Sequence, residues 1–183
     1  HFGLATGQKE ILTQVYFGTP HPSYRDHLQH LVGKLGFPES FVWKMGNEKT
    51  KEPLNIVLEG SKESRLKIGQ LKHRLLGALL SDFYRPLRVA YVFSRVYANE
   101  MYHPTSSPQR IYQAVKELNA WFKVTHTPLK IHESQGAYSL KPLSSHVALK
   151  VPHPRWWDEN RHDGLSKLKH STAGSSFSAA EAC

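Results

Sequence analysis

The chain has 183 residues, of which 39% are hydrophobic and 21% are charged, so it can form one domain with a core or two small ones. This composition is ordinary for a soluble globular protein and excludes neither an enzyme nor a binding protein. The 24 Lys and Arg exceed the 15 Asp and Glu by nine, and this excess of positive charge favours a polyanionic partner.

The first region, residues 1 to about 52, is predicted to be a helical hairpin. Residues 8–17 and 24–37 place apolar side chains at helical spacing, and the turn-rich residues between them supply Ser23 as a predicted N-cap. Two helices cannot bury their apolar faces alone, so this region either packs on the next one or ends an upstream domain. The apolar residues that define the two stripes are Ile11, Val15, Tyr24, Leu28, Leu31 and Leu35.

The second region, residues 53 to about 142, is predicted to contain a strand, three helices and a β-hairpin. Residues 53–60 contain a short apolar run rich in β-branched residues that ends at Gly60, which is typical of a strand. Helical spacing then predicts helices over 65–83, 85–100 and 106–123, with Pro86 in the first turn of the second and Ser107 as N-cap of the third. Alternation around Gly136 predicts a hairpin over 128–142.

The third region, residues 143 to 183, loses this periodicity and is predicted to be an irregular arm followed by a disordered tail. Trp156 and Trp157 are the exception, because two adjacent tryptophans are rarely left in water. We expect them to clamp the arm onto the body of the protein.

Other features limit the compartment and the chemistry. The single cysteine, Cys183, rules out an internal disulfide and a cysteine metal site. No apolar run is long enough to span a membrane, and no secretory signal is seen. We therefore expect a cytoplasmic protein. The chain begins with His1 rather than methionine, so we expect a fragment. His27 and His30 are three residues apart on one predicted helix but have no third metal ligand spaced nearby, and His153, His162 and Asp163 follow no recognised metal-site spacing. No catalytic motif occurs in the sequence. We therefore expect no metal, no cofactor and no enzyme activity.

Residues 65–141 resemble the winged helix-turn-helix DNA-binding (effector) domain of the OmpR/PhoB-type transcriptional regulators. The resemblance lies in LLGALLSDFYRPLRVAYVFSRVY for two helices, SSPQRIYQAVKELNAWF for the third, and PLKIHESQGAYSL for a wing. It implies a mainly α fold with a small β component, that is, three helices plus a β-hairpin wing, here preceded by the helical hairpin. It also implies that the third helix enters the major groove of double-stranded DNA while the wing touches the minor groove or backbone.

The third helix carries the residues expected to meet DNA. With Ile111, Val115 and Leu118 on the buried side, the outward residues are predicted to include Ala114, Glu117 and Ala120. Arginines are expected to supply affinity from the second helix and its start, and amides to read adenine edges. Tyr112 is a further predicted base or sugar contact. The full set of predicted DNA-binding residues is Arg85, Arg88, Arg95, Arg110, Tyr112, Gln113, Lys116, Asn119 and Lys123.

The sequence also departs from this family. Glu117, Asn119 and Ala120 stand where strongly binding members commonly have arginines, and Glu133 and Ser134 replace a basic residue and a glycine in the wing. Against this, residues 61–142 contain 13 Lys and Arg but 5 Asp and Glu, so most of the basic excess lies in this region.

Two functions therefore stay open. The leading prediction is a DNA-binding output domain of a transcription regulator, with an upstream regulatory domain and a homodimer as open alternatives for its assembly. The rival is a protein-interaction module that has kept the winged-helix skeleton and lost its DNA face. A continuous basic surface over the third helix and wing would favour DNA, whereas a large apolar patch there would favour a protein partner.

Overall fold

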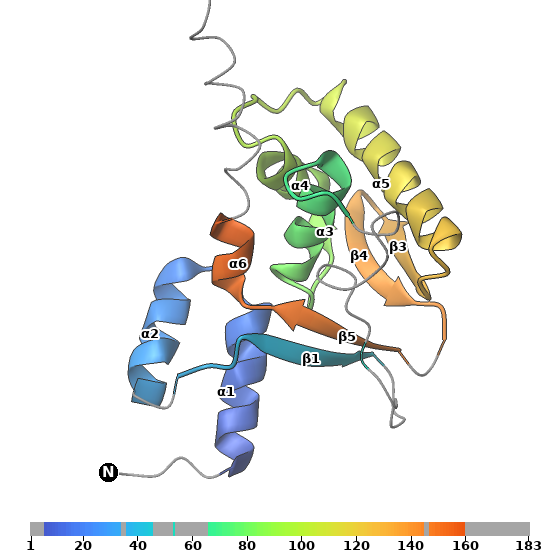
Figure 1. Cartoon of the computed structure of the whole chain (residues 1–183). Coiled ribbons are helices and arrows are strands. Elements are labelled where there is room, and N and C mark those ends of the chain that lie inside the picture. Colours follow the sequence, from blue (N-terminus) through green and yellow to red (C-terminus); the bar gives the residue numbers. More distant parts are fainter. Residues whose placement is uncertain (1–5, 34–35, 46–52, 54–65, 145–146, 160–183) are drawn as a thin grey trace, which may run out of the picture.

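Helices and short strands alternate along the chain in a mixed α/β structure in which helices predominate. The computed structural model describes residues 6–33, 36–45, 53, 66–144 and 147–159. None of the described helices is long and apolar enough to span a membrane. The elements, labelled as in Figure 1, are α1 (Thr6–Gly18), α2 (Pro22–Val32), β1 (Ser40–Met45), α3 (Leu71–Leu80), β2 (Leu87–Arg88), α4 (Val89–Val96), α5 (Ser107–Val124), β3 (Leu129–Ser134), β4 (Ala137–Pro142), β5 (Val147–Pro152) and α6 (Pro154–Glu159).

The two helices predicted near the N-terminus are present, but their details differ from the prediction. Helix α2 begins at Pro22, one residue before the predicted N-cap Ser23, and His21 occupies the cap position without a side-chain hydrogen bond. Proline suits the first turn because its fixed φ is helical and its missing N–H has no helical partner there. The capping prediction was therefore wrong by two residues.

The buried faces of α1 and α2 are also narrower than the apolar pattern predicts. Tyr16 and Phe17 of α1 and Leu28 of α2 are almost fully buried. In contrast, Ile11, Tyr24 and Leu31 are 63%, 47% and 57% exposed. Two short helices that each pack along one side cannot cover all of their apolar residues, so these three stay exposed although they lie in the predicted helices.

A two-stranded antiparallel sheet, β1 with β5, was not predicted. Its register runs from Ser40 opposite Pro152 to Met45 opposite Val147. Strand β5 and the short helix α6 occupy residues 147–159, so the prediction of an irregular arm was wrong for this stretch. The strand predicted over 53–60 lies outside the described residues apart from Pro53, which is in no strand. The domain boundaries near residues 52 and 142 stay predictions.

The middle of the chain follows the order α3, β2, α4, α5, β3, β4. Helix α3 is shorter than the predicted 65–83, and α4 starts at Val89 rather than near residue 85. Leu87 and Arg88 form β2 instead, paired with Tyr138 and Ala137 of β4. The prediction that Pro86 lies in the first turn of a helix was wrong, because the two residues after it, Leu87 and Arg88, are held extended by this pairing. The second sheet has the strand order β2-β4-β3.

The predicted β-hairpin is confirmed by the pairing of β3 with β4, from Leu129 opposite Pro142 to Ser134 opposite Ala137. Gln135 and Gly136 form the two-residue turn, with φ angles of 51° and 71°. Positive φ at both central residues is the signature of a type I′ turn, whose twist matches the paired strands. The Gly136 carbonyl accepts a hydrogen bond from the Val89 N–H, so the turn is tied to the start of α4.

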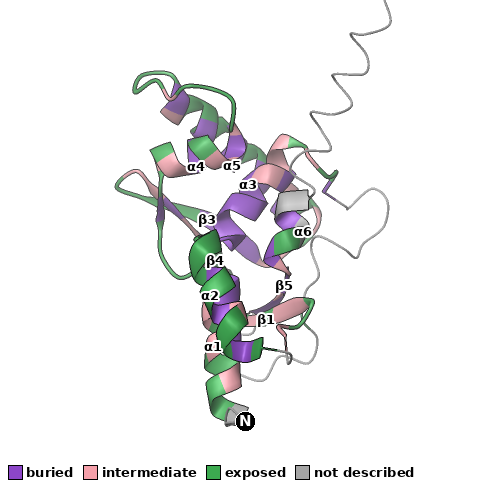
Figure 2. Ribbon diagram, turned by 90° about the vertical axis from the view of Figure 1, so that its left-hand side faces the viewer, coloured by how far each residue is buried: buried purple, intermediate pink, exposed green. Residues whose placement is uncertain are grey.

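One hydrophobic core joins all of these parts. It includes Phe17 of α1, Leu75 and Leu76 of α3, Phe122 of α5 and Leu149 of β5. Helix α3 lies in the middle of the molecule and is buried along most of its length (Figure 2). Helices α4 and α5 and strand β4 pack against α3, and α6 contacts it through Trp157.

Trp157 of α6 clamps the end of the described chain onto α3, as the sequence predicts. Its side chain is 8% exposed, and its ring lies 5.2 Å from the His73 ring of α3. A methyl group at Gly77 would stand only 2.6 Å from the Trp157 ring, so the indole reaches the α3 backbone because residue 77 has no side chain. The side chain of Trp156 is outside the described set.

His73, beneath Trp157, predicts a pH dependence of stability. Burial, with a smaller contribution from Arg74, lowers the pKa of His73 from 6.5 to about 4. The unfolded chain therefore binds this proton at a higher pH than the folded one, and the stability gained from a neutral His73 is complete above about pH 6.5 and lost as the pH falls towards 4. Urea unfolding of the wild type and His73→Gln at pH 4.5 and 7.5 measures this loss. We expect the free energy of unfolding to change less between the two pH values in the variant than in the wild type. Equal changes in both proteins would contradict the assignment to His73.

Candidate nucleic-acid interface

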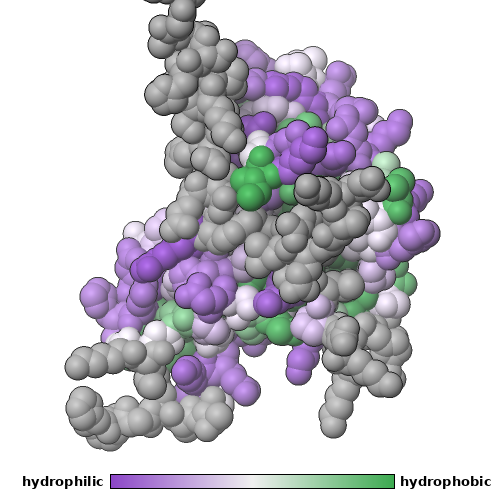
Figure 3. Space-filling view, viewed as in Figure 1, coloured by the Kyte–Doolittle hydropathy of each residue, from purple (hydrophilic) through white to green (hydrophobic). Residues whose placement is uncertain are grey.

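The outer face of α5 is the candidate binding surface. Ile111, Val115, Leu118 and Phe122 form its buried side, as the spacing predicts. The surface over α5 is mostly hydrophilic in the space-filling view (Figure 3). The exposed residues of this helix are Gln109, Arg110, Tyr112, Gln113, Lys116, Glu117, Ala120, Lys123 and Val124.

Ala114 was predicted to face outward but is fully buried. It comes three residues after Ile111 and four before Leu118, so it lies on the same side of the helix as both. The buried stripe of α5 is thus wider than the predicted one, because α3, α4 and β3 all pack against this helix.

Asn119 was predicted to read base edges, but its amide joins α5 to β3. Its side-chain nitrogen donates to the Ile131 carbonyl at 3.2 Å, and its oxygen accepts from the Ile131 N–H at 2.8 Å. Both polar atoms of the amide are therefore used within the protein. This pairing fixes the angle between α5 and the hairpin, so Asn119 positions the candidate surface rather than contributing an unpaired amide to it.

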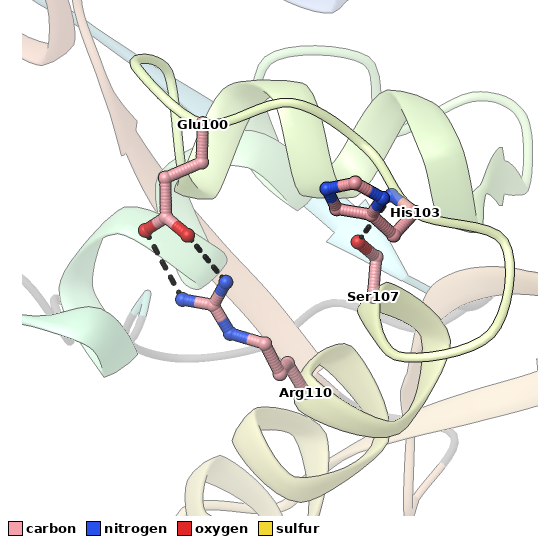
Figure 4. Close-up of polar contacts among 4 residues, drawn as sticks. All are labelled: Glu100, His103, Ser107 and Arg110. Carbon is pink, nitrogen blue, oxygen red and sulfur yellow. Dashed lines mark hydrogen bonds and ion pairs between the residues drawn. The ribbon is translucent and has the colours of Figure 1, made fainter.

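Arg110 lies at the first turn of α5 and is held by the segment that precedes the helix. Its guanidinium donates to both carboxylate oxygens of Glu100 (Figure 4). The guanidinium also stacks on Tyr97, 3.9 Å from the centre of the ring. This hydrogen bonding keeps the pKa of Glu100 below its usual value. In the same segment, the His103 N–H donates to the Ser107 hydroxyl oxygen at 2.9 Å. Arg110 therefore ties the loop between α4 and α5 to both helices.

The start of α5 differs by one residue from the prediction. The helix begins at Ser107, with Ser106 at the N-cap position and Pro108 within the first turn. Ser107 is 1% exposed and its hydroxyl is turned to the His103 backbone, so it is not the predicted cap.

Tyr112, Gln113, Lys116 and Lys123 all reach solvent from α5. Tyr112 is 64% exposed, which is unusual for a large aromatic residue and leaves its ring accessible. Gln113 donates to the Glu117 carboxylate at 3.1 Å, one turn further along the helix. Lys116 and Lys123 form no ion pair with any residue in the described ranges.

The three predicted arginines before α5 point to different parts of the molecule. Arg88 is exposed on β2, directly opposite Ala137 of the hairpin turn region. Arg85 is exposed and forms an ion pair with the buried Asp82, which raises the pKa of Arg85. Arg95 is partly buried and lines two small cavities beside Trp157, so it belongs to the junction with α6 rather than to the hairpin side.

The hairpin carries basic residues that the sequence prediction did not include in the site. Lys130 of β3 lies directly opposite Lys141 of β4, and both are exposed together with His132 on the same strand face. Alternation along 128–142 could have identified this face, because Leu129 and Ile131 are the buried partners of the pattern. Glu133, which stands in the wing where a basic residue is usual, is bonded within the turn. Its carboxylate accepts a hydrogen bond from the Gly136 N–H at 2.8 Å within the turn.

The charge of this part of the chain is strongly asymmetric. Residues 66–144 contain 11 Lys and Arg but 4 Asp and Glu. Each of the four acidic side chains has a partner within the protein: Arg85 for Asp82, Arg110 for Glu100, Gln113 for Glu117 and the Gly136 N–H for Glu133. Two of these partners, Arg85 and Arg110, are charged, so Glu117 and Glu133 keep their charge. The other nine Lys and Arg of this stretch outnumber these two carboxylates, so its unpaired charge is mainly positive.

In the described part of the chain, no three His, Cys, Asp or Glu residues lie close enough to hold a metal ion. No family model, no curated protein and no solved structure matches this chain.

Proposed function

We propose that residues 66–142 form a winged helix-turn-helix that binds double-stranded DNA, with α5 in the major groove and the β3–β4 hairpin as the wing. The observation that carries the proposal is the topology: three helices, a two-residue strand after the first, and a hairpin whose second strand pairs with that strand. This is the element order that the resemblance to the OmpR/PhoB-type effector domains implies. A cytoplasmic transcription regulator that acts by binding rather than by catalysis fits this proposal.

The charge distribution supports DNA over a protein partner. An interaction module would be expected to expose a contiguous apolar patch on α5. The exposed large apolar residues of this helix are Tyr112 and Val124, which are about 18 Å apart along its axis. The remaining exposed side chains are polar or charged apart from Ala120, and the balance is basic.

The structure changes which residues we assign to DNA contact. Lys116 and Lys123 would meet phosphates from α5, and Arg88 would do so beside the wing. Tyr112 and Gln113 are the remaining predicted base contacts, with Gln113 first leaving Glu117. Arg110 and Asn119 would act indirectly by holding α5 in place, and Arg95 is left out of the proposed site.

A salt titration tests the proposal. Fluorescence anisotropy with mixed-sequence duplex DNA is measured at several salt concentrations between about 50 and 200 mM. Because each phosphate contact contributes about −0.9 to the slope of log affinity against log salt, five to seven contacts predict a slope of about −4 to −7. Absence of binding at the lowest salt concentration would contradict the proposal.

Matched charge variants separate contact from general attraction. The double variant Lys116→Gln with Lys123→Gln should make the slope less steep by about 2, since two phosphate contacts are lost. The control, Lys9→Gln with Lys44→Gln, removes the same charge from the distant α1 and β1 and should leave the slope nearly unchanged. Equal losses in both proteins would mean that net charge alone attracts DNA and that α5 is not the interface.

A further inference from the structure

Strand β1 has one paired edge and one edge that no described strand covers. The His153 N–H donates to the Glu39 carbonyl, which makes these two residues a hydrogen-bonded pair of the antiparallel ladder. Such pairs alternate along the strands, so Phe41 and Trp43 direct their N–H and C=O groups towards β5. It follows that the N–H and C=O groups of Ser40, Val42 and Lys44 point away from β5.

A groove of about 780 Å³ runs along this second edge. Four consecutive residues of β1, from Phe41 to Lys44, line it. Successive side chains of a strand point to opposite faces, so a groove that touches four in a row must follow the edge of the strand rather than one face. Its opposite wall is α1, through Lys9, Glu10, Thr13 and Gln14. Helix α1 continues past β1 on this side of the two-stranded sheet (Figure 1).

The wall of the groove opposite α1 is largely apolar and aromatic. Phe37, Phe41 and Trp43 line it and are only partly buried, and Val42 is 38% exposed. Trp43 and Phe41 are held rigidly because each stacks on Phe83, with ring centres 4.4 and 6.2 Å apart. The groove thus offers outward backbone hydrogen-bonding groups beside fixed apolar side chains, which is what recognition of an extended peptide requires.

We propose that this groove binds an extended segment of another protein, which adds to β1 as a third strand and packs its inner side chains between Trp43 and α1. The segment would be apolar at alternate positions and acidic at its flanks. Lys9 and Lys44 lie at the groove with Glu10 as the opposing charge, and the chain as a whole carries nine excess positive charges. The nine excess positive charges of the chain also oppose its association with a second copy.

Selection of random peptides displayed on phage, with the whole chain as the target, tests the proposal. We expect enriched peptides that alternate apolar and polar residues and carry Asp or Glu at their ends. The decisive variant is Val42→Pro, which removes an outward N–H without touching the ladder to β5. It should weaken binding of the enriched peptides by about tenfold or more, since one hydrogen bond is lost and the proline ring crowds the added strand. Val42→Thr keeps the N–H and the branched shape and should lose far less binding than Val42→Pro.

A second variant tests the proposal independently if Val42→Pro lowers the stability of the protein. Lys9→Glu with Lys44→Glu should weaken acidic peptides, more at low salt than at high salt. The proposal is overturned if no peptide is enriched, or if the enriched peptides bind Val42→Pro as well as Val42→Thr. A dimer that Val42→Pro dissociates would also overturn the proposal, because a second copy of the chain would then fill the groove. So would peptides that bind only after residues 54–58 are replaced by Gly and Ser, because the chain itself would then fill it.

Discussion

Trp157→Ala should lower the free energy of unfolding by about 3–5 kcal/mol, the cost typical of truncating a large buried aromatic side chain. The indole is 8% exposed and fills the space between α6 and α3, where it contacts Gly77 and His73. Its removal would leave a cavity that the rigid α3 backbone cannot close. For a protein of this length the loss corresponds to a fall in melting temperature of roughly 6 to 20 °C, measurable by calorimetry or by urea unfolding.

A double-mutant cycle with Gly77 tests whether the contact itself is responsible. Gly77→Ala in the wild type should destabilise the protein, because the new methyl group would stand 2.6 Å from the Trp157 ring. In the Trp157→Ala background the same change should be neutral or stabilising, since alanine favours a helix over glycine by about 0.5–1 kcal/mol. Additive effects of the two substitutions would mean that α6 and α3 are not coupled through this contact.

Asn119→Ala should lower the free energy of unfolding by about 2–4 kcal/mol. Ile131 is 2% exposed, and the substitution leaves both its N–H and its carbonyl without the partner that Asn119 provides. An unpaired buried polar group costs about 1–3 kcal/mol, and here two such groups would be left. Urea unfolding followed by circular dichroism measures the loss.

The matched control is Gln113→Ala, which removes another amide from the same helix. Gln113 is exposed and bonds to Glu117 alone, so its loss should change stability by no more than about 0.5 kcal/mol. If the stabilities of the two variants were equal, Asn119 would not join α5 to the hairpin. The two residues should also differ in DNA binding, where Gln113→Ala and not the folded Asn119→Ala should alter sequence preference.

Local sequence patterns were sufficient for α5 and the hairpin. In α5, Ile111, Val115, Leu118 and Phe122 follow spacings of four, three and four residues, and all four are buried. In the hairpin, a glycine at the second turn position follows one alternating run and precedes another, and strands β3 and β4 form around it. Each of these elements depends on neighbours in the chain, which is why its sequence specifies it.

Strands β1, β2 and β5 could not be identified in the same way. Five of the six residues of β5 are buried, so its sequence lacks the alternation that marks a strand with one wet face. Strand β2 is only two residues long and exists because β4 lies beside it. Strand β1 depends on a partner far away in the sequence, and no local pattern reports such a pairing.

The candidate site shows the same division between local and distant information. The exposure of Tyr112, Lys116 and Lys123 follows from helical periodicity, and the structure places them as predicted. The roles of Asn119 and Arg110 do not, because their partners, Ile131 and Glu100, lie outside the helix. A polar residue on a helix face can serve a ligand or the fold, and only its tertiary neighbours decide which.

The pairing of β1 with β5 also has a consequence for synthesis of the chain. Ser40 meets Pro152, more than a hundred residues later, so on a ribosome working at about 5–20 residues per second β1 waits roughly 5 to 20 s for its partner strand. During that interval the whole length of β1, with Phe41, Val42 and Trp43, is available to any binding chaperone or to another nascent chain. Helices α1 and α2 and strand β1 are thus made before β5, yet β1 can reach its final pairing only after β5 has been translated.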